Sequence, residues 1–179
     1  MDKAYNNACE KNNIIVNDVF FVSFTENFKY LGSWISYDLH DTFDVESRIS
    51  KANQAMGALK FFWDSDEVDI RSKYLIYMAI PMNLLTWGCE SRALTKICFK
   101  KLEVFHMRSI RSILRIKWSE VMEDRMRNSK IRRMFYNINT VEIQMVKRRL
   151  TFIGRVVRME TNKVPGRLIS AWIGGKKDR

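Results

Sequence analysis

The chain has 179 residues, of which 46% are hydrophobic, including 11 Phe and 5 Trp, so it can bury the core of one domain or of two small ones. Only 7 Gly and 2 Pro occur, which disfavours a turn-rich β-sandwich and favours helices. No apolar run reaches the roughly 18 residues of a membrane span, and the polar first 13 residues lack a signal-peptide pattern. We therefore expect an intracellular protein without a membrane partner.

The positive charge is concentrated in the second half of the chain. The formal net charge is +11; residues 1–95 carry 9 Lys/Arg and 13 Asp/Glu, whereas residues 96–179 carry 22 and 7. Such asymmetry is typical of proteins that meet a polyanion, either nucleic acid or a membrane surface. The alternative is a solvated surface or a basic tail. We expect nucleic acid, because the basic residues fall on predicted helices with apolar faces.

The cysteines indicate neither a disulfide framework nor a metal site. Cys9, Cys89 and Cys98 are odd in number and widely spaced, and no CxxC pair occurs. His40 and His106 do not complete a tetrahedral ligand set with them. We expect reduced, structural thiols.

Residues 14–35 are predicted to form short antiparallel strands. Ile14–Val16 and Val19–Phe24 are β-prone runs split by the turn-prone Asn17-Asp18. Phe28–Ile35 is a third such run, in which the strand stops at Gly32. A small sheet of this kind is only marginally stable alone, so its apolar face needs a partner.

A first helix is predicted from Asp44 to Trp63, with Thr42 or Asp44 as its N-cap. Six apolar residues at spacings of 4, 3, 4, 3 and 4 form one stripe on it: Val45, Ile49, Ala52, Met56, Leu59 and Trp63.

A second helix starts near Asp69, and Pro81 should end or kink it because proline has no backbone N–H. A further helical piece follows and closes at Gly88. The acidic residues before this helix favour a solvated turn over a metal site: Asp64, Asp66, Glu67 and Asp69.

A third helix, from about Thr95 to Ile116, has two distinct faces. One carries a core stripe of Cys98, Leu102, Phe105, Ser109 and Ile113. The other carries four cations that repel one another unless a polyanion neutralises them: Lys101, Arg108, Arg111 and Arg115. His106 has only Glu103 as a nearby acidic group, so we expect a helix-surface or core-edge histidine rather than a general base.

The remaining chain is predicted to contain two short helices, over 119–127 with Ser119 as N-cap and over 130–136, and one long helix. The long helix begins at Asn139, where Asn139 and Glu142 fit a capping box. Beyond Met159 the pattern fades into loop and tail. The apolar stripe expected to face the core comprises Ile143, Val146, Leu150, Ile153 and Val157, and another side carries the cations Lys147, Arg148, Arg149, Arg155 and Arg158.

Five segments in this order resemble a known family. They read FKYLGS (28–33), RISKA (48–52), GCESRALT (88–95), LEVFHMR (102–108) and FIGRVVRM (152–159). Together they resemble the end of the palm, the thumb and the downstream helical region of non-LTR (LINE-type) retrotransposon reverse transcriptases, over roughly residues 14 to 159.

The resemblance implies a mainly α fold, in which short N-terminal antiparallel strands precede a thumb-like helical bundle. It implies a truncated palm end over 1–36, a thumb-like domain over 37–116 and a basic C-terminal extension over 117–179. In the family the catalytic carboxylates form an [FY]xDD turn upstream of the FKYLGS strand, and this chain has no Asp-Asp pair. We therefore expect no catalytic residue and no cofactor here, since Mg²⁺ belongs to the missing palm.

The implied activity is nucleic-acid binding without polymerisation. The implied partners are RNA or an RNA–DNA hybrid and the missing palm and fingers, with no small-molecule substrate. The implied location is the nucleus. The strand would act as a primer grip and the helices would contact phosphates. The implied site residues are Lys29, Tyr30, Gly32, Arg48, Lys51, Lys101, Arg108, Arg111, Arg115, Lys147, Arg148, Arg155 and Arg158.

The sequence departs from the family at two points. Arg92 stands where the family often has Trp, and Arg115 where it usually has Gly. These departures fit an inactive genomic remnant, which is one alternative. The other is a small helical protein-interaction module whose basic face meets an acidic partner.

Overall fold

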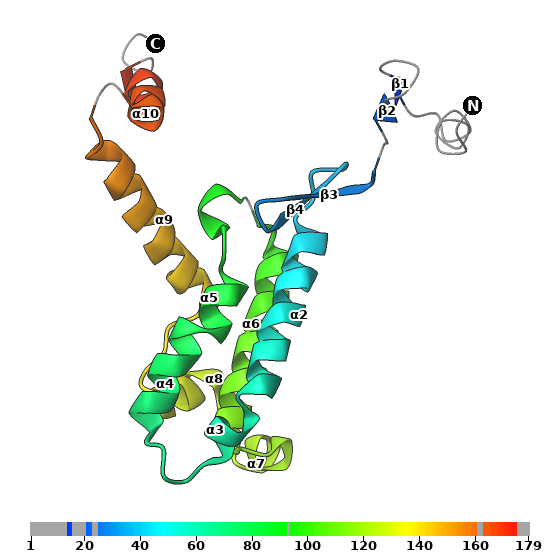
Figure 1. Ribbon diagram of the computed structural model, residues 1–179. Helices are drawn as coiled ribbons and strands as arrows, with labels where there is room; N and C mark the ends of the chain where they lie inside the picture. Colours follow the sequence, from blue (N-terminus) through cyan, green and yellow to red (C-terminus); the bar gives the residue numbers. More distant parts are fainter. Residues whose placement is uncertain (1–13, 16–20, 23–24, 93, 161–162, 175–179) are drawn as a thin grey trace. The chain divides into compact units, whose positions relative to one another are not determined.

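The computed structural model describes residues 14–15, 21–22, 25–92, 94–160 and 163–174 (Figure 1). The fold is mainly helical with short antiparallel strands before the helices, as predicted. The chain divides into two compact units, residues 1–44 and residues 45–179. Within the described ranges, no helix has both the length and the apolar character needed to cross a membrane.

The first unit contains two antiparallel hairpins. Strand β1 (Ile14–Ile15) pairs with β2 (Phe21–Val22), and β3 (Asn27–Tyr30) pairs with β4 (Ser33–Ser36). Asn17-Asp18, the predicted turn, lies outside the described residues. The predicted single sheet is replaced, in the described part of the chain, by two separate two-stranded sheets.

The second hairpin turns at Leu31 and Gly32. Their φ angles are 46° and 83°, so both central residues of a two-residue turn are left-handed. Strand β3 ends at Tyr30, two residues before the predicted end at Gly32, and Phe28–Ile35 is not one strand, because the turn sends Trp34 and Ile35 back antiparallel. Leu31 is 81% exposed.

Asp44 anchors this hairpin instead of capping a helix. Helix α2 (Thr42–Ala58) already includes it, and its Oδ1 accepts a hydrogen bond of 2.8 Å from the backbone N–H of Trp34. The Trp34 ring also meets Phe43 edge to face, at 5.1 Å between centroids. The predicted cap role of Asp44 is therefore wrong, because its carboxylate serves the strand.

Helix α2 and helix α3 (Lys60–Asp64) together carry the predicted apolar stripe. Its members are confirmed at the core: Val45, Ala52 and Trp63 are buried, and Ile49, Met56 and Leu59 pack against them. The predicted single helix breaks at Leu59, and Trp63 Nε1 donates to the carbonyl oxygen of Met56 across the break at 3.1 Å.

The turn from 65 to 69 leads into α4 (Ile70–Ala79), whose N-cap is Asp69. Asp69 accepts from the Ser72 N–H at 3.1 Å, and hydrogen bonding to Ser72 lowers its pKa. The amino group of Lys73, a buried residue, donates to the carbonyl oxygens of Trp63 at 2.7 Å and Ser65 at 2.8 Å. Lys73 thus supplies the hydrogen-bond donor for carbonyl oxygens that have no partner within α3.

Pro81 begins a new helix, as its missing N–H predicts. Helix α5 (Pro81–Leu85) starts there and is followed by the short 3-10 helix η1 (Cys89–Ser91) after Gly88. Helix α6 (Lys96–Ile113) is capped by Thr95, which accepts from the Cys98 N–H at 3.3 Å. Its predicted core stripe is confirmed, because Cys98, Leu102, Phe105, Ser109 and Ile113 are all buried.

Helices α7 (Trp118–Glu123), α8 (Asn128–Met134), α9 (Val141–Val157) and α10 (Val164–Gly174) complete the second unit. Three local predictions are corrected. Lys117, not Ser119, precedes α7, and Thr140, not Asn139, caps α9. The predicted C-terminal loop is largely α10, since Pro165 falls in the first turn, where proline fits.

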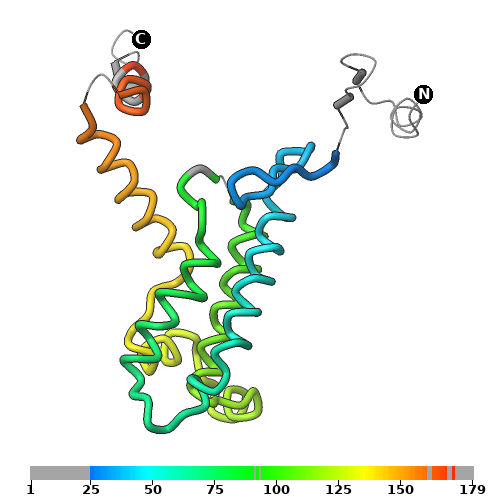
Figure 2. Tube along the Cα trace, viewed as in Figure 1, coloured from blue at the N-terminus to red at the C-terminus, as the bar shows by residue number. Residues whose placement is uncertain are grey.

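The core of the second unit lies among helices that alternate in direction. The chain runs one way in α2 and α6 and the opposite way in α4, α5 and α9 (Figure 2). Tyr77 and Phe135 are among its largest fully buried side chains, and their rings meet edge to face at 5.7 Å.

The apolar stripe predicted to bury α9 is exposed. Ile143, Val146, Leu150, Ile153 and Val157 are each between 44% and 64% exposed. The α9 residues that are buried instead are Val141, Met145 and Val156. Helix α9 is therefore rotated relative to the prediction.

Candidate nucleic-acid interface

The basic face of α9 comprises Lys147, Arg148, Thr151, Arg155 and Arg158. Arg148, Thr151, Arg155 and the C-cap Arg158 are three or four residues apart and therefore share a side of the helix, and Lys147 lies one turn before Thr151 on the same face. Lys147, Arg155 and Arg158 are exposed, and Arg148 is half-buried. The structure thus brings together four of the thirteen predicted site residues.

A cavity of about 320 Å³ adjoins this face. Its lining includes Lys147, Arg148 and Arg155, and Glu90 is the one acidic residue among the described residues that line it. The remaining lining residues are Gln144, Thr151 and Phe152. Amide, ammonium and guanidinium donors beside an aromatic ring suit an anionic ligand.

Two arginines hold α9 against α5 and the η1 segment. Arg148 donates to Asn83 Oδ1 from α5. Arg149 donates to the carbonyl oxygens of Cys89 at 3.0 Å and Arg92 at 2.5 Å. These contacts position the basic face. The sequence pattern did not distinguish Arg149, which holds the helix in place, from the exposed cations Lys147 and Arg155.

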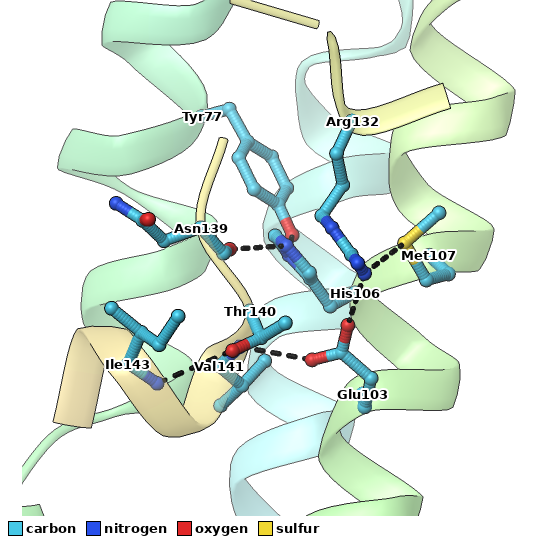
Figure 3. Close-up of polar contacts among 9 residues, drawn as sticks. All are labelled: Tyr77, Glu103, His106, Met107, Arg132, Asn139, Thr140, Val141 and Ile143. Carbon is cyan, nitrogen blue, oxygen red and sulfur yellow. Dashed lines mark hydrogen bonds and ion pairs between the residues drawn. The ribbon is translucent and has the colours of Figure 1, made fainter. Parts of the chain in front are cut away.

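The start of α9 is fixed by a carboxylate from α6 (Figure 3). Glu103 Oε2 accepts from the Val141 N–H at 2.9 Å, and its Oε1 pairs with Arg132 at 3.1 Å. Thr140 Oγ1 accepts from the Ile143 N–H at 3.3 Å. Two of the open N–H groups at this helix start are thereby satisfied. Sequence reasoning missed this role of Glu103, since its partners lie 29 and 38 residues away.

His106 is a core residue rather than a base in a site. Its Nδ1 accepts from the Tyr77 hydroxyl at 2.8 Å, and its Nε2–H donates to the Asn139 carbonyl oxygen at 3.2 Å (Figure 3). A carbonyl only accepts, which assigns the proton to Nε2. Burial lowers the pKa of His106 to about 4, and burial also raises the pKa of Tyr77.

The four cations predicted along α6 all have partners on neighbouring elements. Lys101 pairs with Glu46 at 2.5 Å, Arg108 donates to Asn53 Oδ1 at 2.8 Å, Arg111 lies 5.4 Å over the Trp118 ring, and Arg115 pairs with Asp66 at 2.8 Å. The first two contacts join α6 to α2, which runs beside it (Figure 1).

Arg48 departs from its predicted role. Only 3% of it is exposed, so its guanidinium does not face outward to a phosphate, whereas Lys51 is partly exposed. The burial of Arg48 could have been predicted from the sequence, because Arg48 lies one turn before Ala52 and three residues after Val45, at the edge of the buried stripe.

The remaining predicted residues belong to the first unit. The Lys29 amino group lies 5.8 Å from the centre of the Trp34 ring, across the β3–β4 pair. Tyr30 is 57% exposed beside the turn that contains Gly32.

A second hollow, of about 410 Å³, lies between α2 and α6. Ile49, Val104 and Phe105 give it an apolar lining, with Lys101 and Arg108 among the charged residues that also border it. It is less suited to an anion than the α9 cavity.

Cys89 and Cys98 are buried, and burial raises the pKa of the Cys89 thiol. Cys9 lies outside the described residues. Over the ranges that the structure covers, no three His, Cys, Asp or Glu side chains are grouped so that they could hold a metal ion.

Comparisons of the chain with protein-family models, with curated proteins and with solved structures found no match.

Proposed function

We propose that the second unit binds RNA or an RNA–DNA hybrid through its phosphates, as the thumb and C-terminal region of a LINE-type reverse transcriptase would. The observation that carries this proposal is the basic face of α9, with its adjoining cavity. In this role Lys147, Arg155 and Arg158 contact the backbone, and Arg148 is a contact at the cavity wall.

The electrostatics of this face favour a polyanion. Like charges one turn apart on a helix destabilise it by a few tenths of a kcal/mol per pair, and a phosphate backbone removes that repulsion. Gln144 adds a neutral amide donor to the same cavity, whereas the Thr151 hydroxyl already donates to the Lys147 carbonyl oxygen at 2.8 Å. Contacts of this kind position a duplex without reading its sequence.

The cations of α6 take a secondary part in the proposal. Some of these cations are held in exposed ion pairs, for example Lys101 with Glu46. Such a pair contributes about 0–1 kcal/mol to the stability of the fold. A phosphate can therefore replace Glu46 or Asp66 at little cost. Arg48 takes no part, because it is buried.

No catalytic step is assigned to this chain. In the family that it resembles, nucleotide transfer belongs to carboxylates and Mg²⁺ in the upstream palm. The proposed contribution of this chain is to hold the duplex.

The test is the salt dependence of binding to a short, fluorescently labelled RNA–DNA hybrid, measured by anisotropy. Each lost phosphate contact should reduce the slope of log K against log salt by about 0.9. The double variant Arg155→Ala/Arg158→Ala should therefore reduce it by about 1.8. Arg108→Ala/Arg111→Ala/Arg115→Ala should reduce it less per residue.

The matched control removes two exposed lysines from α3 and α8, in the variant Lys60→Ala/Lys130→Ala. It lowers the net charge equally but should leave the slope nearly unchanged. A wild-type affinity that is the same at low and moderate salt would overturn the proposal. Equal slopes in the α9 variant and the control would also contradict it, because binding would then follow net charge alone.

A further inference from the structure

The third face of α9 is an exposed aliphatic stripe, the apolar seam, made of Ile143, Val146, Leu150, Ile153 and Val157. Leu150 and Val157 are the most exposed, at 64% and 62%. The helix is anchored on a different side, by Val141, Met145 and Val156. The seam is thus presented by a helix that is already formed and already packed.

The seam has the spacing of a coiled coil. Its members are separated by 3, 4, 3 and 4 residues, which is the alternation of the two core positions of a heptad. A stripe that merely covers a globular core is usually wider and includes a third position per heptad. The narrow seam therefore fits another helix with the same spacing.

The charges beside the seam fit a second copy of α9. In this register Glu142 precedes the first core position, Ile143, and Lys147 follows the next one, Val146. In a parallel two-stranded coiled coil these flanking positions of the two chains face each other. Both side chains are exposed, so two symmetric Glu142–Lys147 pairs would form between copies. An antiparallel arrangement does not bring these two positions together.

From the heptad spacing and these charges, we propose that two copies of this chain associate through α9, as a short parallel coiled coil along the apolar seam. The contact is two-fold symmetric, so each copy offers the same surface. The seam lies beside the face that carries Arg155 and Arg158, and pairing leaves those cations accessible. The proposal does not require nucleic-acid binding, although both proposals use Lys147, which in the dimer pairs with Glu142 of the other copy.

The test is the molar mass of the whole chain in solution, followed by sedimentation over a range of concentrations. The monomer mass is 21.3 kDa, and the wild type should rise toward twice this value as concentration increases. Leu150→Glu places a charge in the centre of the seam and should keep the chain monomeric. Phe61→Glu is the matched control, because Phe61 is 92% exposed on α3, and it should dimerise like the wild type.

The orientation is tested by reversing the flanking charges. Glu142→Lys and Lys147→Glu should each weaken dimerisation, and the double variant Glu142→Lys/Lys147→Glu should restore it. Circular dichroism checks that every variant keeps its helix content. A wild type that stays monomeric at all concentrations overturns the proposal. A dimer that Leu150→Glu leaves intact also overturns it, and a dimer indifferent to both single charge reversals overturns the parallel arrangement.

Discussion

The hydroxyl of Tyr77 donates a hydrogen bond to Nδ1 of His106 at 2.8 Å inside the helical core, where burial favours the neutral imidazole. Burial lowers the His106 pKa to about 4 from its ordinary 6.5. The unfolded chain therefore takes up the proton first as pH falls. The free energy of unfolding should decline between about pH 6.5 and pH 4, by up to about 3 kcal/mol.

Urea unfolding at a series of pH values would measure this decline. The variant His106→Gln has no titrating group at this position, so its unfolding free energy should change less over the same interval, although it starts lower. Parallel curves for the two proteins would show that other groups cause the acid sensitivity.

Glu103 should matter mainly for the start of α9. Glu103→Ala removes the acceptor of the Val141 N–H and leaves Arg132 without its carboxylate, which should cost about 1–3 kcal/mol of stability. Glu103→Gln keeps an acceptor and should cost less. Hydrogen exchange at Val141 is the local readout, and unchanged protection in Glu103→Ala would contradict the assignment.

Lys73 should contribute more to the free energy of unfolding than an exposed lysine, because its amino group donates to two carbonyl oxygens. Lys73→Met fills similar space but abandons the oxygens of Trp63 and Ser65, so we expect a loss of about 1–3 kcal/mol in thermal or urea unfolding. Lys60→Met, on the exposed side of α3, is the control and should be nearly neutral. Equal effects would mean that the bonds of Lys73 contribute little.

Leu31 occupies a left-handed position that a residue with a Cβ adopts at a cost of roughly 1–2 kcal/mol. Leu31→Asn should relieve part of this cost and stabilise the β3–β4 hairpin by about 1 kcal/mol, because asparagine tolerates this conformation. The Tyr37 N–H, which bonds the Glu26 carbonyl oxygen at 2.9 Å beside this hairpin, should then exchange about fivefold more slowly. Leu31→Ala lacks the short polar side chain that lets asparagine tolerate this conformation and should gain little; an equal gain would point to hydrophobic exposure instead.

The sequence predicted those elements in which one apolar period dominates. The stripes from Val45 to Trp63 and from Cys98 to Ile113 repeat at spacings of three and four residues, and their apolar members lie in or against the core. The break at Pro81 followed from its missing N–H. The α2 and α6 elements and the start of α5 could therefore be derived from local chemistry alone.

Helix α9 could not be oriented in this way, because it has two apolar sides. Its regular seam is a stronger periodic signal than the scattered Val141, Met145 and Val156, yet the scattered set is buried. Which side faces inward depends on Glu103 and Arg149, whose partners are distant in sequence. The basic face was predicted from Lys147 to Arg158, but its cavity depends on η1, which no periodicity indicates.

The bond from Glu103 to the first N–H of α9 also determines what an insertion would do. Each added residue turns the rest of an α-helix by about 100°. One alanine inserted after Val141, with Glu103 and Thr140 still holding the helix start, would swing Arg155 and Leu150 together around the axis and carry Met145 out of the core. The hydrogen bond to Glu103 thus helps to fix the rotation of α9 about its axis, and with it the directions in which the basic face and the apolar seam point.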